Sequence, residues 1–192
     1  MTFLILGLII FLGVHSVRIF ANDWRTAQIA RFGEGTWKGF YSLASLVGFV
    51  LIVWGYGQAQ LDPVVLSNPP AWTRQLAAPL TLLAFVLVPA AYVPGTRIKA
   101  WLGSPMVLGV KLWAFAHLIA NGTLAAVVLF GSFLVWAVVD FASERRRDRA
   151  AGVVYPKGSL ARDAVATAIG LVAWLLFAFW LHGWLIGVRP FG

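Results

Sequence analysis

Residues 2 to 21 read TFLILGLIIFLGVHSVRIFA, a run in which His15 and Arg18 are the only ionisable side chains. A membrane-spanning helix needs about 20 apolar residues to cross about 30 Å of hydrocarbon. The run therefore predicts a first transmembrane helix. The alternative is a cleaved secretory signal, but the run lacks a basic start and its apolar part is too long for one.

The composition of the whole chain also points to a membrane. Of its 192 residues, 60% are hydrophobic and 11% are charged. A soluble domain of this length cannot cover so much apolar surface with so few charges, so lipid is the expected solvent. The chain has no cysteine. This excludes disulfides, iron–sulfur clusters, thiolate haem ligation and cysteine nucleophiles, and leaves the three histidines as the obvious metal ligands.

Five further segments have the length and composition of membrane spans: Trp37 to Ala59, Leu76 to Val93, Ser104 to Ala120, Thr123 to Phe141 and Ala164 to Gly187. The Ser104 segment is the most sharply bounded. Ser104 can cap the helix, Pro105 suits its first position, and Asn121-Gly122 is a turn pair. The predicted fold is an all-α integral membrane six-helix bundle.

The basic residues predict how the bundle is oriented. With the first loop on the cytoplasmic side, eleven Lys and Arg residues lie in inside loops and only Arg74 and Arg189 lie outside. Cytoplasmic loops carry such an excess, so both termini are expected on the non-cytoplasmic side. The run ERRRDR at 144 to 149 is interpreted as part of this signal, with lipid head-group binding as the alternative. No aromatic-and-basic platform for nucleic acid is visible, and no nucleic acid is expected as a partner.

Ionisable residues inside the predicted spans are the candidates for function, because each is costly in hydrocarbon unless it is paired. They are His15, Arg18, Lys111, His117 and His182. Two histidines from different helices could hold one haem iron, and two cations could meet its propionates. In the alternative interpretation each histidine hydrogen-bonds a carbonyl, and Arg18 reaches toward the head groups.

The pairing of the histidines is left open by their positions. His15 and His117 would differ in depth by about 15 Å at 1.5 Å per residue. His182 lies at the depth of His117 and is the substitute ligand, although a histidine near the interface is tolerated without a metal. Trp113 is four residues before His117 and would line the same pocket or pack in the core. Zinc and di-iron centres are disfavoured, because Asp140 is the only acidic residue in a predicted span.

Glycines in the first two predicted spans suggest how these helices meet. Small residues let the backbones of membrane helices approach closely. The glycines concerned are Gly7, Gly13, Gly48, Gly55 and Gly57. We expect them to lie at helix–helix contacts.

Three short stretches carry a resemblance to a known family: GLIIFLGVHSVR at 7 to 18, SPMVLGVKLWAFAHLIANG at 104 to 122, and LHGWLIGV at 181 to 188. Their order and spacing resemble those of the NnrU family, small bacterial membrane proteins often associated with denitrification. The family is related to the plant zeta-carotene isomerase, an integral membrane enzyme with haem b. The resemblance covers nearly the whole chain and implies one transmembrane domain over residues 1–192. It also implies a multi-pass protein of the bacterial inner (cytoplasmic) membrane.

The resemblance implies haem b as cofactor and His15 and His117 as the axial ligands of its iron. Arg18, Lys111 and Trp113 would then contact the cofactor. In the reduced isomerase one ligand is thought to leave, so that ferrous iron can engage a polyene and let a cis double bond rotate. This chain has Gly103-Ser104-Pro105 where the family usually has Arg-His-Pro, and Ala114 where the isomerase has a cysteine.

Redox-gated haem chemistry on a hydrophobic substrate is the expected function, with cis–trans isomerisation of a zeta-carotene-like polyene as the specific expectation. The catalytic residues are not predicted. One alternative is a non-enzymatic haem protein for electron transfer, sensing or nitrite and nitric oxide metabolism. Another is a haem-free scaffold. The expected partners are membrane lipid, a hydrophobic small molecule such as a polyene, and a redox partner.

Overall fold

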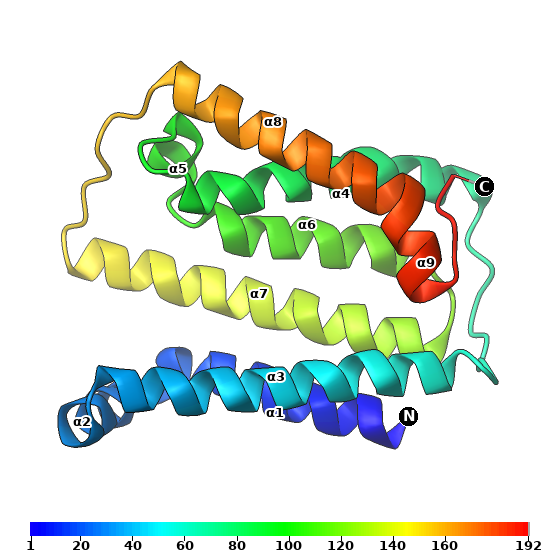
Figure 1. Ribbon diagram of the computed structural model, residues 1–192, viewed down its shortest axis with the longest axis horizontal. Helices are drawn as coiled ribbons and strands as arrows, with labels where there is room; N and C mark the ends of the chain where they lie inside the picture. Colours follow the sequence, from blue (N-terminus) through cyan, green and yellow to red (C-terminus); the bar gives the residue numbers. More distant parts are fainter. Residues whose placement is uncertain (192) are drawn as a thin grey trace.

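The computed structural model describes residues 1–191 as a bundle of roughly parallel and antiparallel helices (Figure 1). The prediction of an all-α fold is confirmed. In chain order the elements are α1 Thr2–Phe20, α2 Asn22–Phe32, α3 Glu34–Ala59, α4 Ala71–Tyr92, α5 Arg97–Leu102, α6 Pro105–Ala120, α7 Leu124–Ala150, α8 Leu160–Leu176, the π-helical turn η1 Phe177–Leu181, and α9 His182–Ile186.

Within residues 1–191, five helical segments are long and apolar enough to cross a membrane: α1, α3, α4, α7 and the continuous stretch Leu160–Ile186. The protein is therefore a multi-pass membrane protein. The helix α6 is apolar but has only 16 residues, or about 24 Å at 1.5 Å per residue, which is less than the usual hydrocarbon thickness. The count of six spans therefore stays a prediction.

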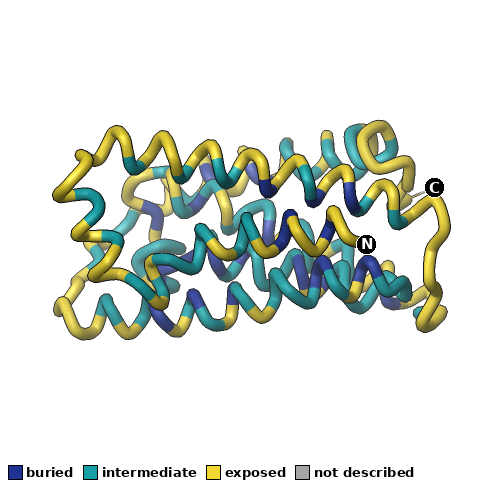
Figure 2. The backbone as a smooth tube through the Cα atoms, turned by 90° about the horizontal axis from the view of Figure 1, so that it is seen from below, coloured by how far each residue is buried: buried dark blue, intermediate teal, exposed yellow. Residues whose placement is uncertain are grey.

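The helix α7 lies in the middle of the bundle. It has α1 on one side and α6 on the other, while α3 packs on α1, α4 packs on α6, and α8 packs on α4 (Figure 1). The outward faces remain exposed and the buried positions face inward (Figure 2). Many large apolar side chains lie on the outward faces, among them Phe40 and Trp180. Lipid is the solvent that such a surface requires.

The closest helix contact joins α1 and α3, and glycines make it possible. A Cβ atom on Gly7 would lie 2.6 Å from the backbone nitrogen of Ile52, and one on Gly48 would lie 2.8 Å from the backbone nitrogen of Phe11. A Cβ on Gly55 would overlap the backbone of Leu4. The prediction for these three glycines is confirmed. It is wrong for Gly13 and Gly57, because a Cβ there would meet nothing within 4 Å.

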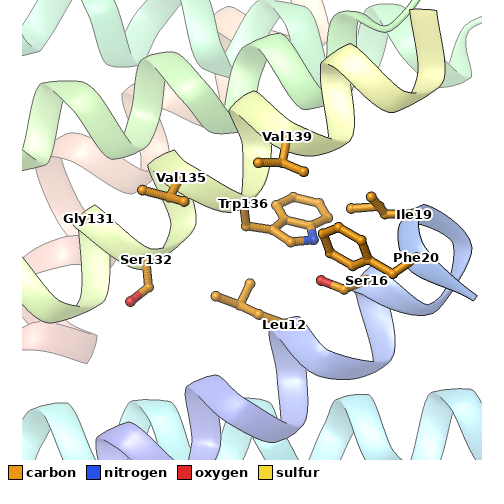
Figure 3. Close-up of a pocket in the computed structure, with 9 residues that line it drawn as sticks. All are labelled: Leu12, Ser16, Ile19, Phe20, Gly131, Ser132, Val135, Trp136 and Val139. Atoms are coloured by element: carbon orange, nitrogen blue, oxygen red, sulfur yellow. The ribbon is translucent and has the colours of Figure 1, made fainter. Parts of the chain in front are cut away.

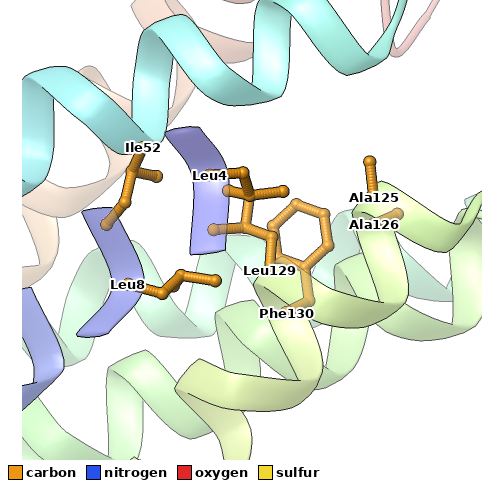
Figure 4. Close-up of a cluster of buried hydrophobic side chains, with 7 residues drawn as sticks. All are labelled: Leu4, Leu8, Ile52, Ala125, Ala126, Leu129 and Phe130. Atoms are coloured by element: carbon orange, nitrogen blue, oxygen red, sulfur yellow. The ribbon is translucent and has the colours of Figure 1, made fainter. Parts of the chain in front are cut away.

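A cluster of buried apolar side chains joins α1 and α3 to α7 (Figure 4). Its members are Leu4, Leu8, Ile52, Ala125, Ala126, Leu129 and Phe130. The small Ala125 and Ala126 let the start of α7 approach α1, so that Leu4 is fully buried. Dispersion contacts of this kind hold membrane helices together, because lipid removes most of the hydrophobic driving force.

Several helix boundaries differ from those predicted. Helices occupy two segments predicted as loops, at α2 and α5. The helix α7 continues beyond Phe141 through the charged run and ends at Ala150. The helix α8 begins at Leu160 and is capped by Ser159, whose hydroxyl accepts a hydrogen bond from the Arg162 backbone N–H. These segments lack the apolar periodicity of a span, and a charged helix outside the hydrocarbon gives the same sequence pattern as a loop. The predicted bounds of α6 are confirmed, but the Ser104 hydroxyl does not cap it.

The basic loops gather at one end of the bundle. Figure 1 places α2, α5 and the segment between α7 and α8 at this end, and the N-terminus and α9 at the other. We call the first of these the basic end. The eleven basic residues predicted to be cytoplasmic all lie in or beside these elements, whereas Arg74 and Arg189 lie toward the opposite end. The cytoplasmic assignment of the basic end stays a prediction.

Candidate functional site

His15 lies on α1 and faces α3 and α7, and aromatic rings surround it. Its ring stacks on Phe11 with centroids 4.2 Å apart, and it lies 5.1 Å from the ring of Tyr41 and 6.0 Å from that of Trp136. Its Nδ1 lies 2.7 Å from the carbonyl oxygen of Phe11. A carbonyl oxygen can only accept, so this hydrogen bond places the imidazole proton on Nδ1 and leaves Nε2 as a free electron-pair donor.

His117 has the same local geometry near the end of α6. Its Nδ1 lies 2.8 Å from the carbonyl oxygen of Trp113, again four residues earlier. Its ring stacks on Phe130 of α7 with centroids 4.7 Å apart. As at His15, Nε2 remains available for a ligand.

His182 lies beside His117. The two ring centroids are 6.5 Å apart and the ring planes differ by 19°. The Nδ1 of His182 lies 2.6 Å from the carbonyl oxygen of Val188. His182 is the first residue after the π-helical turn η1, and such turns frequently lie at functional sites.

His15 and His117 face α7 at two different levels. His15 meets Trp136 and His117 meets Phe130, six residues earlier on the same helix. Six residues correspond to about 9 Å along the axis, compared with the predicted 15 Å. Between the two levels lies an aromatic layer in which Phe133 contacts Phe11 at 5.8 Å and Trp113 at 5.5 Å.

The other predicted site residues are distributed along the bundle. Trp113 contacts the His117 ring with centroids 5.3 Å apart. Lys111 is further from His117, and its Nζ lies 4.6 Å from the centroid of the Phe141 ring. Arg18 lines a polar cavity at the basic end. The structure thus brings together His117, His182 and Trp113. It places His15 apart from them, beside Trp136, and Arg18 at the basic end.

An apolar cavity of about 530 Å³ lies between α1 and α7, and Trp136 is one of the residues that line it (Figure 3). Leu12, Ile19 and Phe20 line it from α1. Val135 and Val139 line it from α7. Two serines also line it, Ser16 from α1 and Ser132 from α7. The indole Nε1 of Trp136 is buried without a hydrogen-bond partner among the described residues. The cavity is open to the surface, and its mostly apolar lining suits a hydrophobic molecule.

Sequence reasoning missed the aromatic side chains from α3 and α7 around the histidines. They are Tyr41, Phe130, Phe133 and Trp136. Phe130, Phe133 and Trp136 recur at intervals of three along α7, which indicates one helical face. That spacing was a usable signal, but it does not reveal which neighbouring helix the face meets.

The histidines supply imidazole donors of the kind that bind haem iron, although no histidine lines either the apolar cavity or the polar cavity at the basic end. Metal–imidazole bonds are about 2 Å long, so two imidazoles on opposite sides of one metal have centroids about 6 Å apart. The separation of His117 and His182 is close to this value. Hydrogen bonds from Nδ1 to a carbonyl also orient histidine ligands in metal sites. In residues 1–191 no three His, Cys, Asp or Glu side chains gather as a metal site, so the arrangement differs from that of a zinc or di-iron centre.

The fold and these side chains define a class: a multi-pass helical membrane protein with histidines enclosed by aromatic rings inside the bundle. The NnrU protein family model matches residues 3–190, so the chain belongs to the NnrU family. No curated protein and no solved structure matches the chain.

Proposed function

We propose that this protein binds haem b within the bilayer, with His117 as one axial ligand of the iron. The observation that supports this most directly is the near-parallel pair formed by His117 and His182. The hydrogen bond from each Nδ1 to a carbonyl is also what the interpretation without haem predicts, and it leaves each Nε2 available. His182 is the second ligand that the geometry favours. His15 is the one that the family resemblance favours, and its Nε2 is equally free.

Bound haem would supply a redox-active iron whose sixth position can open. The protein's part is to hold the imidazoles in the correct tautomer and to keep water away. The aromatic rings of Phe130, Trp113 and Phe133 would keep water away from the iron. If His15 is the second ligand, Arg18 and Lys111 are the cations that could meet the propionates, because both lie on the basic-end side of the histidines and a carboxylate in the bundle requires a cation.

An absorption spectrum of the purified protein, as isolated and after dithionite, tests haem binding. We expect a Soret band in protein expressed with haem available. His117→Ala should abolish it, and free imidazole should restore part of it. A protein without a Soret band under these conditions would overturn the proposal.

Comparing His15→Ala with His182→Ala identifies the second ligand. The variant that loses a ligand should change from a six-coordinate to a five-coordinate spectrum, while the other keeps the parent spectrum. Equal size-exclusion profiles for the two variants exclude misfolding as the cause of the spectral change.

We also propose that the haem acts on a hydrophobic substrate, with cis–trans isomerisation of a polyene as the specific reaction. The apolar cavity between α1 and α7 supports this, since its wall includes Trp136, which also contacts His15. Cells that make the protein would be fed a poly-cis carotene and its isomers separated. An altered isomer profile that disappears in His117→Ala supports the enzyme. An unchanged profile with an intact haem spectrum favours a non-enzymatic haem protein.

A further inference from the structure

A second cavity, of about 430 Å³, lies at the basic end, away from the histidines. Five parts of the chain contribute to it: α1, the end of α4, α5, the start of α6, and the end of α7 with the loop that follows. The charged side chains that line it are Arg18, Lys99, Glu144, Arg147 and Asp148. It therefore lies where the bundle would meet the head groups of a bilayer.

The cations of this cavity are held by neutral oxygens. The Nζ of Lys99 donates to the carbonyl of Ala91 at 3.0 Å. An Nη1 of Arg147 donates to the hydroxyl of Ser143 at 2.6 Å and, more weakly, to the carbonyl of Arg18 at 3.5 Å. Within residues 1–191 neither Lys99 nor Arg147 forms an ion pair with a carboxylate.

The carboxylates of the cavity do not balance its cations. Asp148 is already paired with Arg145 at 3.1 Å and accepts a hydrogen bond from Tyr155 at 2.8 Å. Among the residues that line the cavity, Glu144 is left to offset three cations. Asp140, one turn earlier on α7 and outside the lining, is the further carboxyl close enough to interact with Arg18 and Arg147. A cavity with this excess of positive charge attracts an anion.

The start of α6 adds neutral donors to the same cavity. Ser104, Pro105, Met106 and Val107 all line it. Pro105 has no backbone N–H, so the donors of the first turn are the N–H groups of Met106 and Val107. Ser104 is only 8% exposed, and its hydroxyl makes no capping bond to the helix. The first backbone N–H groups of a helix have no intrahelical acceptor, and the helix dipole favours an anion there.

We propose that this cavity binds a phosphate group, most naturally that of an anionic lipid at the membrane surface. Arg147 and Lys99 supply the charge, and the Ser104 hydroxyl and the first turn of α6 supply donors. Val107 and Val153 give it an apolar wall that suits the glycerol end of a lipid. Basic pockets between membrane helices on the cytoplasmic side bind such head groups.

The charged run on α7 provides a matched control. Arg147 lines the cavity, whereas Arg146 and Arg149 on the same helix are exposed and do not. Replacing Arg147 and Lys99 by Gln removes two positive charges from the cavity. Replacing Arg146 and Arg149 by Gln removes two positive charges from the same end of the protein without touching it.

The experiment measures phosphatidylglycerol bound to the detergent-purified protein by native mass spectrometry, with phosphatidylcholine as the neutral comparison. We expect the K99Q/R147Q pair to bind phosphatidylglycerol about 30-fold more weakly, or about fivefold per cation. The R146Q/R149Q pair should bind it nearly as well as the parent. Equal losses in the two pairs, or no loss in either, would overturn the proposal.

Inorganic phosphate forms the second arm of the experiment. If phosphate alone raises the melting temperature of lipid-free protein and K99Q/R147Q removes this effect, the ligand is a free phosphate. If only phosphatidylglycerol binds, the ligand is the lipid. Should the double variant aggregate, Lys99→Arg with Arg147→Lys keeps the charge and must keep binding. Arg18 is left unchanged because it is also the proposed haem contact, so the result does not depend on haem.

Discussion

Tyr155 connects the segment after α7 to that helix. Its hydroxyl donates to Oδ2 of Asp148 at 2.8 Å, and Arg145 binds the same oxygen at 3.1 Å. Partial burial raises the pKa of Tyr155, and the hydrogen bond to Asp148 acts in the same direction because only the neutral phenol can donate. The neutral form of Tyr155 is therefore favoured in the folded protein.

We predict that Tyr155 ionises at a higher pH than an ordinary tyrosine, for which the pKa is about 10. The difference between the ultraviolet titrations of the parent and Tyr155→Phe isolates its phenolate. A group with a raised pKa contributes stability that is present below the unfolded pKa and is lost as pH rises through the folded one. The variant should lose about 1 kcal/mol of unfolding free energy at neutral pH. A Tyr155 midpoint at or below the ordinary value would contradict this.

Single residues also show what the sequence could and could not predict about the site. The positions of His15, His117 and Arg18 along their helices follow from apolar length alone, and they are confirmed. Which side chains these three residues face depends on how each helix is rotated against its neighbours. The nearness of His117 and His182, with ring centroids 6.5 Å apart, arises from that packing, and no local pattern encodes it.

At the scale of helices, the contact between α1 and α3 depends on backbone approach. A Cβ on Gly7 would meet backbone atoms of Ile52 and Gly48, at 2.6 and 2.8 Å. Backbone cannot move aside as a side chain can, so the two helices would have to separate. Gly13, on the same helix, has nothing within 4 Å of its Cβ position.

We predict that Gly7→Ala destabilises the protein by about 1–3 kcal/mol through overpacking. Gly13→Ala should be neutral or stabilising by up to about 1 kcal/mol, because alanine favours a helix. Thermal unfolding in detergent, followed by circular dichroism, measures both. Equal melting temperatures for the two variants would show that the approach of α1 and α3 does not limit stability.

The helix boundaries show why some elements were predictable. Pro105 and Asn121-Gly122 are strong local signals, and α6 begins and ends where they predict. The extension of α7 through residues 142 to 150 has no apolar signal. Contacts such as that of Arg147 with Ser143, one turn earlier, stabilise it instead.

The start of α5 also depends on a contact that no local pattern predicts. Asp163 accepts hydrogen bonds from the Arg97 and Ile98 backbone N–H groups there, and these segments are far apart in the chain.

At the scale of the whole molecule, the basic residues divide the bundle into two unlike ends. Asp62 lies in the exposed segment between α3 and α4, at the end that holds the N-terminus (Figure 1). Val154 lies between α7 and α8 at the basic end and is 88% exposed. The absence of cysteine lets a single introduced thiol report each end.

We predict that Asp62→Cys reacts with a membrane-impermeant maleimide in intact spheroplasts, while Val154→Cys reacts only after lysis. This follows if the basic end is cytoplasmic. Labelling of the unmodified chain gives the background. The reverse pattern would invert the orientation.

The central position of α7 has a consequence for biosynthesis. The helices α1 and α3 pack on each other, α4 and α6 do the same, and α7 joins the two pairs. Both pairs are synthesised before Leu124. A nascent chain truncated before Leu124, and extended by a linker that spans the ribosomal exit tunnel, should show photo-crosslinks within each pair and none between α1 and α6. Assembly in the membrane would then be completed by the late insertion of one hydrophobic segment between two preformed hairpins.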